Sequence, residues 1–358
     1  MMHKIDRRAF LGQSILGTSL AGAVNSWSSP AGAQTRPARP GRSFTSASQG
    51  GQYQKGFEAA FVTPVLQKHG LELRSDSFDY AKLQIQVQSG RVEWDFADVG
   101  EWFGYWGMAR NLFEPIDYKV VDRSLIPAGG ALSHVVQNAV LGRVMAYNTK
   151  VYSTRYPRTW EEFWDVKAFP GKRGFWGSPH SGILEAALMA DGVPPGKLFP
   201  LDLDRAFKSL DRIKAHLIPA KSGSALFQLF VDEQIDLSLA LEGRLSDAID
   251  AGAPWTQQWQ WSLYQKEWII IPKGSPYRDV AMEVIAHAVT PAAQAKYTEL
   301  TGYGPSSPAA FKLLGRKYLD RFVYSPARDL QKVVQQDGAW YAANVDQVNQ
   351  RWQQWLAS

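Results

Sequence analysis

The stretch LELRSDSFDYAKLQIQVQSGRVEWDFADVG, residues 71–100, holds the pattern that decides the fold. Leu71 to Ser75 and Trp94 to Val99 have the composition of β-strands. Tyr80 to Ser89 lies between them with the spacing of an amphipathic helix, and Gly90 closes that helix. A strand, a helix and a second strand in this order form a βαβ unit. The stretch therefore predicts an α/β protein with mostly parallel sheets.

The same alternation continues on both sides of this stretch. Before it, Arg42 to Ser48 predicts a strand and Tyr53 to Lys68 a helix. After it, Glu101 to Trp106 is dense in aromatic residues. Gly104 and Gly107 interrupt the rings, which argues against a simple core helix. We expect an aromatic loop that contributes to a pocket.

A second α/β series follows in the rest of the chain. It begins with a long strand over Val135 to Tyr147, and Thr159 with Glu162 forms the capping-box pattern of a short helix. Further strands are predicted over Arg173–Trp176, Ile235–Leu241 and Trp268–Pro272, and helices over Gly182–Asp191, Leu203–His216, Ala225–Glu233, Val280–Val289, Pro291–Thr301 and Ala327–Leu356. Two such series indicate two lobes with a ligand cleft at the carboxyl ends of the strands.

The N-terminus has the order of segments found in an export signal. Arg7 and Arg8 are followed by Phe10-Leu11, close to the twin-arginine pattern, and then by a mildly apolar run. Ala31-Gly32-Ala33 is a small-x-small cleavage site. Residues 1–33 are therefore predicted to be a twin-arginine signal peptide and residues 34–42 a flexible leader. We expect a periplasmic protein.

Composition narrows the classes of function. With 45% hydrophobic and 20% charged residues among 358, the chain is globular, and its net charge of +5 comes without any block of Lys and Arg. A nucleic-acid partner is not indicated. The absence of cysteine excludes disulfides, thiolate metal sites and a lipoprotein anchor. We expect a monomer without a cofactor.

Motifs of catalysis are absent from the sequence. It has no Gly-x-Ser-x-Gly elbow and no phosphate-binding loop, and its six histidines have no metal-ligand spacing. His180, between Ser178 and Ser181, comes nearest to a catalytic cluster, and we interpret it as a loop histidine. A periplasmic hydrolase remains the alternative from another class.

Several short segments, taken in order, resemble the periplasmic solute-binding proteins of ABC importers, with the spermidine/putrescine-binding branch the nearest. These segments are AYNTK at 146–150, TWEEFWD at 159–165, FPGKR at 169–173, DLSLALEG at 236–243 and GYGP at 302–305. The resemblance implies a type II binding-protein fold whose two lobes, joined by crossover strands, close on a ligand. It also implies an inner-membrane ABC permease as partner. Residues 43–146 plus 267–310 would form the first lobe, and residues 147–266 plus 311–358 the second.

The resemblance also indicates where the ligand would bind. Glu267 falls where the family places an acidic ligand contact before an apolar strand, and Glu242 follows an earlier strand. Trp102 lies in the segment that offers aromatic residues, with Glu101 beside it. Other positions at family ligand segments, or at the cleft, are Ser48, Gln49, Ser178, Arg244 and Tyr303.

The residues leave the ligand class open. Carboxylates and rings favour a cationic, polyamine-like solute. Arg244 could instead bind a carboxylate or a phosphonate, in which case the ligand is zwitterionic; an aminophosphonate, a metal ion or another anion-bearing solute are the alternatives. Ser222-Gly223-Ser224 could present backbone N–H groups to an anion, although we interpret it as an ordinary helix N-cap.

Overall fold

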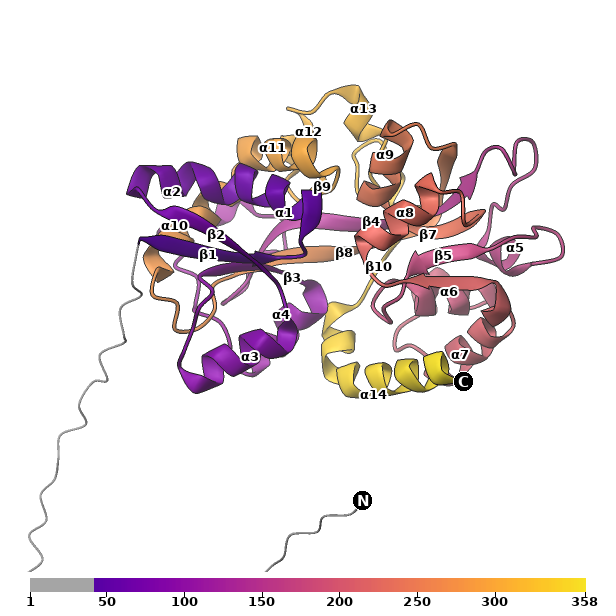
Figure 1. Cartoon of the computed structure of the whole chain (residues 1–358), viewed down its shortest axis with the longest axis horizontal. Coiled ribbons are helices and arrows are strands. Elements are labelled where there is room, and N and C mark those ends of the chain that lie inside the picture. Colours follow the sequence, from indigo (N-terminus) through magenta and orange to yellow (C-terminus); the bar gives the residue numbers. More distant parts are fainter. Residues whose placement is uncertain (1–41) are drawn as a thin grey trace, which may run out of the picture. The chain divides into compact units, whose positions relative to one another are not determined.

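The computed structural model describes residues 42–358, which build one mixed sheet flanked by helices (Figure 1). The predicted signal peptide and residues 34–41 of the leader lie outside the described residues. The strand order is β2-β1-β3-β8-β4-β7-β5-β6, with β10 beside β8 and β9 beside β4. The strands are β1 (Ser43–Ser48), β2 (Glu72–Ser77), β3 (Phe96–Gly100), β4 (Val136–Asn148), β5 (Arg173–Trp176), β6 (Leu217–Ala220), β7 (Leu237–Leu241), β8 (Trp255–Ile270), β9 (Gly304–Pro305) and β10 (Val333–Gln335).

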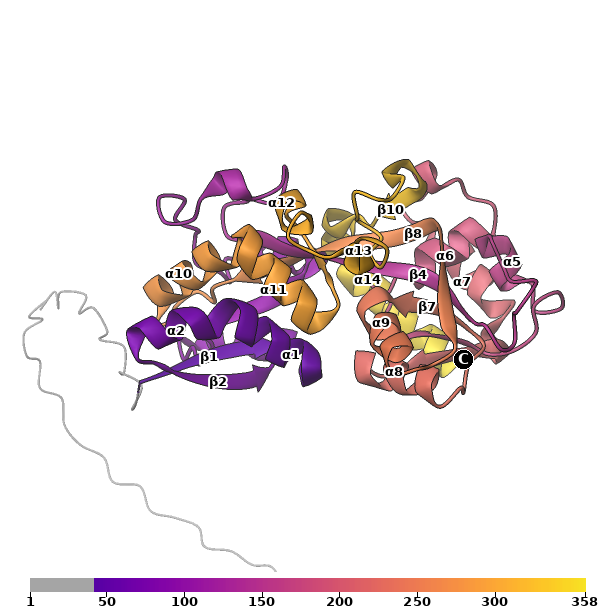
Figure 2. The same ribbon diagram turned by 90° about the horizontal axis from the view of Figure 1, so that it is seen from above.

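The two ends of the sheet are parallel and its centre is antiparallel. Strand β1 pairs in parallel with β2 and β3, and β5 does so with β6 and β7. The long strands β4 and β8 are antiparallel to each other and link the two ends. The result is an α/β fold with two lobes joined by crossing strands, which Figure 2 shows from above. The residue boundaries predicted for the lobes stay a prediction.

Helices cover both faces of the sheet at its β1 end. They are α1 (Gly51–Phe57), the π-helical η1 (Glu58–Val62), α2 (Thr63–His69), α3 (Tyr80–Ser89), α4 (Glu101–Ala109), α10 (Arg278–Ala288), α11 (Pro291–Thr301), α12 (Pro308–Phe311) and α13 (Arg316–Leu319). Strand alternation sends neighbouring residues to opposite cores. Ile269 packs with α1, α10 and α11, whereas Trp268 packs with α3 and α4.

The β5 end is built in the same way. Its helices are α5 (Trp160–Trp164), α6 (Ile183–Ala190), α7 (Leu203–Asp211), α8 (Gly223–Val231), α9 (Glu242–Asp250) and α14 (Gly338–Ala357). The remaining 3₁₀ turns are η2 (Arg123–Leu125), η3 (Pro195–Lys197), η4 (Lys214–His216) and η5 (Leu330–Lys332). Leu239 of β7 packs on the face with α6 and α14, and its neighbour Ala240 packs on the face with α8 and α9.

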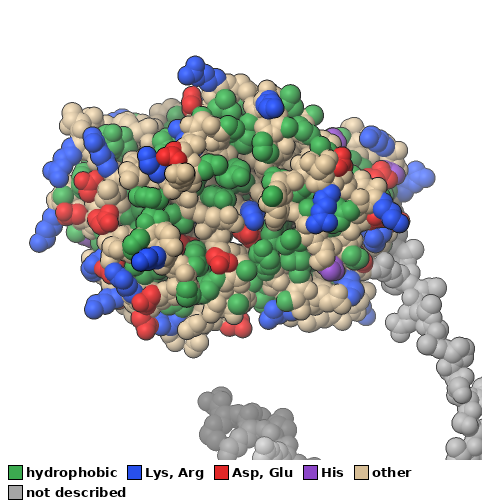
Figure 3. All heavy atoms as spheres, turned by 180° about the vertical axis from the view of Figure 1, so that it is seen from behind, with side chains coloured by type: hydrophobic (Ala, Val, Ile, Leu, Met, Phe, Trp, Pro, Cys, Tyr) green, Lys and Arg blue, Asp and Glu red, His purple; other side chains and the backbone are tan. Residues whose placement is uncertain are grey.

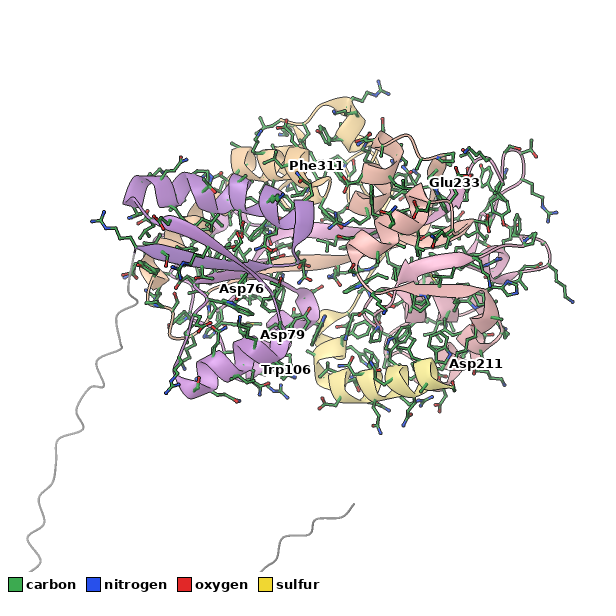
Figure 4. All side chains as sticks on the ribbon, in the orientation of Figure 1. Asp76, Asp79, Trp106, Asp211, Glu233 and Phe311 are labelled. Atoms are coloured by element: carbon green, nitrogen blue, oxygen red, sulfur yellow. The ribbon has the colours of Figure 1, made fainter. Side chains whose placement is uncertain are left out.

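Local signals in the sequence set several element ends. The predicted helix Tyr80–Ser89 is confirmed: the carboxylate of Asp79, which Figure 4 labels, accepts the Lys82 N–H at 2.7 Å, and Gly90 ends the helix at φ +69°. The capping box is half correct. Thr159 Oγ1 accepts from the Glu162 N–H, but the Glu162 carboxylate accepts from the Arg158 N–H instead of that of Thr159.

The expectation of an aromatic loop after β3 is wrong, because these residues form helix α4. The two glycines are there for packing. A Cβ on residue 104 would lie 2.2 Å from a ring carbon of Trp268, and one on residue 107 would lie 2.2 Å from the Phe113 ring. Glycine therefore lets the helix approach two large side chains closely.

Two further expectations differ from the structure. The strand predicted at Trp268 begins at Trp255, because β8 continues far beyond its apolar end. The predicted tail helix begins only at Gly338, after the turn η5 and the strand β10. Within residues 42–358, no helix is both long and apolar enough to span a membrane. Acidic and basic side chains are interspersed over the face shown in Figure 3.

Candidate functional site

A cavity of about 240 Å³ lies where the carboxyl ends of strands from both ends of the sheet converge. Gln49 follows β1, Gly100 ends β3, Trp176 ends β5 and Leu241 ends β7. Ligands of open α/β sheets bind at this kind of position. The full lining is Gln49, Tyr53, Tyr80, Gly100, Trp102, Leu141, Arg143, Trp176, His180, Lys221, Ser222, Gly223, Ser224, Leu241, Arg244, Gln265, Glu267 and Tyr303.

The acidic part of the site consists of Glu267 in the lining and Asp98 behind it. Both carboxyls are buried, and the Asp98 Oδ2 atom accepts from the Tyr53 hydroxyl at 2.9 Å. Burial, and after it repulsion by Asp98, raises the pKa of Glu267 to about 8. Burial also raises the pKa of Asp98 to about 6, while the nearby Ser48 hydroxyl and the hydrogen bond from Tyr53 act to lower it. A cationic group placed beside these two carboxyls would stabilise their ionised forms, so this part of the site favours a cation.

Arg143 and Gln265 connect the acidic part to a basic part. The Arg143 Nη2 atom donates to Gln265 Oε1 at 3.1 Å, and Gln265 Nε2 donates to Glu267 Oε2 at 3.2 Å. Arg143 is only 1% exposed, and its Nε atom has no hydrogen-bond partner among the described residues. Burial lowers the pKa of Arg143. A buried guanidinium with a free N–H can accept an anionic ligand group.

Arg244, Lys221 and the start of helix α8 make up the rest of the basic part. Arg244 Nη1 reaches Asp247 Oδ2 at 3.4 Å, whereas its buried Nε atom has no hydrogen-bond partner within residues 42–358. Ser222 caps α8 by accepting the Ala225 N–H at 3.1 Å. Gly223 allows Arg244 to lie close, because a Cβ there would be 3.0 Å from Arg244 Nε. The first N–H groups of a helix lack partners within it and attract anions.

Aromatic rings form the walls of the cavity. Tyr80 and Trp102 have ring centroids 4.9 Å apart, and Tyr53 and Tyr303 have theirs 5.3 Å apart in an edge-to-face pair. Trp102 also stacks on His180. Burial lowers the pKa of His180 to about 3, so its ring is neutral at physiological pH. Flat rings offer contact area to an alkyl chain and their faces to an ammonium group.

The structure brings five of the nine residues proposed from the sequence to the cavity: Glu267, Trp102, Gln49, Arg244 and Tyr303. The other four lie outside its lining. Ser48 is buried beside Asp98, and Glu101 forms an ion pair with Lys266 at 3.6 Å. The Glu242 carboxylate accepts the Val323 N–H at 2.9 Å, and Ser178 Oγ accepts the His180 N–H at 3.2 Å.

Several lining residues were missed from the sequence. Tyr53 and Tyr80 sit in helices and look like core residues there, and His180 was interpreted as a loop histidine. Arg143 had a usable signal, because it is the single charged residue in the long strand β4. The others are Gly100, Leu141, Trp176, Lys221, Leu241, Gln265 and the Ser222–Ser224 turn, which was interpreted only as a cap.

Two α/β lobes joined by two long strands around a buried, charged cavity define a type II solute-binding protein. The chain belongs to the family of bacterial extracellular solute-binding proteins, whose model matches residues 60–315. It is therefore the substrate-binding component of an ABC importer, working with a permease, and not an enzyme. This overturns the hydrolase alternative.

Individual relatives of this chain are named for, or were solved with, particular solutes. The chain is 29% identical to the gamma-aminobutyric acid-binding protein of Pseudomonas aeruginosa, over 88% of this chain and 91% of that one. A solved GABA receptor is 30% identical with a TM-score of 0.82, over 87% of this chain and 97% of that one. The binding protein AgtB of A. tumefaciens R10, solved with agropinic acid, is also 30% identical, with a TM-score of 0.80 over 88% and 99% of the two chains.

The polyamine branch is a more distant relation than the sequence segments indicated. A spermidine/putrescine ABC transporter structure from Listeria monocytogenes is 15% identical, with a TM-score of 0.73 over 88% of this chain and 99% of that one. At this identity the likeness shows the fold alone. The expected polyamine-binding branch is thus replaced by relatives that bind GABA or an opine.

Proposed function

We propose that this protein captures a small zwitterionic solute, an ω-amino acid such as GABA, and delivers it to an ABC permease. The observation that carries the proposal is the charge pattern of the cavity. Its lining combines the cations Arg143, Lys221 and Arg244 with the single carboxyl of Glu267. A ligand with a carboxylate at one end and an ammonium at the other complements both.

The ligand carboxylate belongs with Arg244 and the start of helix α8. Arg244 is 9% exposed and offers an Nε–H with no protein acceptor in the described chain. The N-terminus of α8 adds backbone N–H groups and the positive end of its dipole. Hydrogen bonds between charged groups are about twice as strong as neutral ones, so this end fixes the orientation of the ligand.

The ligand ammonium belongs with Glu267, among the rings of Tyr53 and Tyr80. An ammonium within about 6 Å of a ring face is attracted by its quadrupole, and more strongly where water is excluded. The carboxyl of Glu267 supplies the opposite charge. A cavity of about 240 Å³ suits a ligand with a short chain between its charged ends.

The relatives support this reading, since two of those compared are named for GABA. A second candidate is an opine with additional carboxylates, as in the relative solved with agropinic acid. The observation that favours it is the excess of cations over carboxyls in the lining.

The polyamine-like solute is less compatible with this cavity. A diamine would place its second ammonium beside Arg143, Lys221 or Arg244, and like charges repel strongly in a buried site. The metal-ion alternative is not supported either: residues 42–358 contain no group of three or more His, Asp or Glu side chains that could hold a metal.

Delivery would follow from closure of the two lobes around the solute. The ligand stabilises this closed conformation because it binds it more tightly than the open one. For export we propose the twin-arginine route, on the Arg7-Arg8 pattern of the sequence.

Calorimetric titration with three four-carbon compounds tests the proposal. GABA carries both charged groups, butyrate lacks the ammonium and putrescine lacks the carboxylate. We expect GABA to bind at least tenfold more tightly than either of the others. Tighter binding of putrescine would restore the polyamine reading, and binding of agropinic acid without binding of GABA would favour the opine reading.

A further inference from the structure

Asp98 and Glu267 lie on the same face of neighbouring antiparallel strands. In the register of β3 and β8, Asp98 is opposite Ile269 and Gly100 is opposite Glu267. The two carboxyl residues are therefore diagonal neighbours, at a separation over which side chains interact directly. Neither the sequence segments nor the cavity lining pointed to Asp98.

Both carboxyls are short of neutralising partners. Asp98 is 0% exposed; its Oδ2 atom accepts from the Tyr53 hydroxyl, but its Oδ1 atom has no hydrogen-bond partner within residues 42–358. Glu267 is 3% exposed and accepts from the neutral amide of Gln265. Within that same range, no Lys or Arg forms an ion pair with either carboxyl.

The charged groups that act most strongly on the pair include more carboxyls than cations, although the cations Lys221 and Arg244 line the same cavity as Glu267. Arg143 is the cation that acts on Glu267, and its hydrogen bond goes to Gln265 instead. The titratable groups around the pair are Tyr53 of α1, Glu58 of η1, Tyr80 of α3, Glu101 of α4, Arg143 of β4 and Tyr297 of α11. Two buried carboxyls this close cannot both ionise at low cost, so one keeps its proton.

We propose that Asp98 and Glu267 share one proton in the empty site and that the ammonium of the ligand replaces it, so that each binding event releases about one proton. The inference rests on the proposed function, because it needs a cationic group beside Glu267. No covalent bond changes: the carboxylic acid becomes a carboxylate paired with the ammonium, and its proton passes to water. Asp98 acts through Glu267, without contacting the ligand, and sets the charge that the site presents.

The raised pKa values of both carboxyls agree with this arrangement, about 8 for Glu267 and about 6 for Asp98. The sign of the pH effect follows. Below about pH 8 the empty site is protonated and the occupied site is ionised, so affinity rises with pH. One released proton corresponds to about a tenfold gain for each pH unit, until the empty site is itself ionised.

Titration of the protein with GABA at pH 7, in phosphate and in Tris, measures the proton directly. The two buffers take up a proton with different heats, so the difference in apparent binding enthalpy gives the number released. We expect about one proton for the wild type. Asp98→Asn should still bind GABA but release fewer protons, and Glu267→Gln should bind weakly and release none. Glu161→Gln, an exposed carboxyl on helix α5 outside the cavity lining, is the control and should keep the wild-type proton count.

The outcomes separate the two proposals. Clear GABA binding with equal enthalpies in both buffers, or with proton uptake, overturns the shared proton and leaves the proposed function standing. Absence of GABA binding overturns the proposed function, and this inference with it. The wild-type measurement and its pH dependence decide the question even where Asp98→Asn fails to fold.

Discussion

The indole ring of Trp102 lies stacked on the imidazole ring of His180, with centroids 4.4 Å apart and planes inclined by 8°. Trp102 comes from helix α4, which follows β3, and His180 from the loop after β5. Tyr341 of α14 completes the cluster, edge-on to His180 at 5.0 Å. The pair therefore joins segments from the two parallel ends of the sheet at the wall of the cavity, and its rings stay neutral because burial keeps the pKa of His180 low.

This contact should stabilise the state that holds the ligand. An aromatic pair contributes about 0.5–1.5 kcal/mol beyond its buried area, so losing it should weaken GABA binding about 2- to 13-fold. Trp102→Ala, His180→Ala and the double variant form a cycle that separates the stacking from the contact of Trp102 with the ligand. Strictly additive losses of affinity in calorimetry would show that the stacked pair does not support binding.

Arg244 should dominate recognition of the ligand carboxylate. Replacing it by Met keeps most of the side-chain volume and removes the charge-assisted hydrogen bonds, which are worth about 1.5–3 kcal/mol. Arg244→Met is expected to bind GABA about 10- to 150-fold more weakly. Arg328→Met is the matched control, since Arg328 lies over the Trp259 ring at 3.7 Å, outside the cavity lining. Equal losses in both variants would exclude a specific role for Arg244.

Glu242 should matter for stability instead of binding. Its buried carboxylate accepts the Val323 N–H, and the backbone N–H groups of Gly142 and Gly304 also favour its charged form. A Gln there would turn an NH₂ group toward backbone donors, so Glu242→Gln should lower the free energy of unfolding by about 1–3 kcal/mol. Urea unfolding measures this, with the exposed Glu161→Gln as control. A selective loss of GABA affinity in folded Glu242→Gln would instead place this residue in the site.

The fold was largely predictable because its signals are local. The spacing of Tyr80–Ser89, its closing Gly90 and the apolar strands on either side needed no tertiary information. Strand β8 was only partly predicted, since its ladder with β4 skips between Leu263 and Gln258, and Trp261 there has φ +57°. An irregular, Gln-rich strand lacks the regular alternation from which strands are predicted.

The site was less predictable, because its residues acquire their roles from pairing across the sheet. Glu267 and Arg244 carried family or charge signals in the sequence. Asp98 becomes part of the site only through the β3–β8 register, and Arg143 only through its bond to Gln265. Helix α4 was mistaken for a loop because glycine lowers helix propensity. The reason for Gly104, its close contact with the Trp268 ring, appears only in the folded structure.

The proposed export route gives a test in cells. Replacing Arg7 and Arg8 together by Lys keeps the positive charge but removes the guanidinium pair that the twin-arginine receptor distinguishes. We expect the precursor of this variant to accumulate in the cytoplasm, measured by fractionation and immunoblotting. A single conservative change downstream, Lys55→Arg in α1, serves as control. Normal periplasmic yield of the Lys-Lys variant would indicate the general secretory route.

The last prediction concerns the stability of the ligand-free protein between about pH 6.5 and 8. Burial raises the pKa of Glu242 to about 7 and that of Glu267 to about 8, above the value of about 4.3 for an unfolded Glu. In this window the folded chain therefore holds protons that the unfolded chain has released, and its free energy of unfolding falls as pH rises. His180 opposes this trend only at the lower end of the window, because it is neutral in the folded chain and half protonated in the unfolded chain at about pH 6.5; the two carboxyls outweigh it. Urea unfolding at pH 6.5, 7.2 and 8 should show a steady decline, which Glu267→Gln should make shallower. Stability that rises through this window would mean that these carboxyls are ionised in the folded protein, and would remove the basis for a proton shared between Asp98 and Glu267.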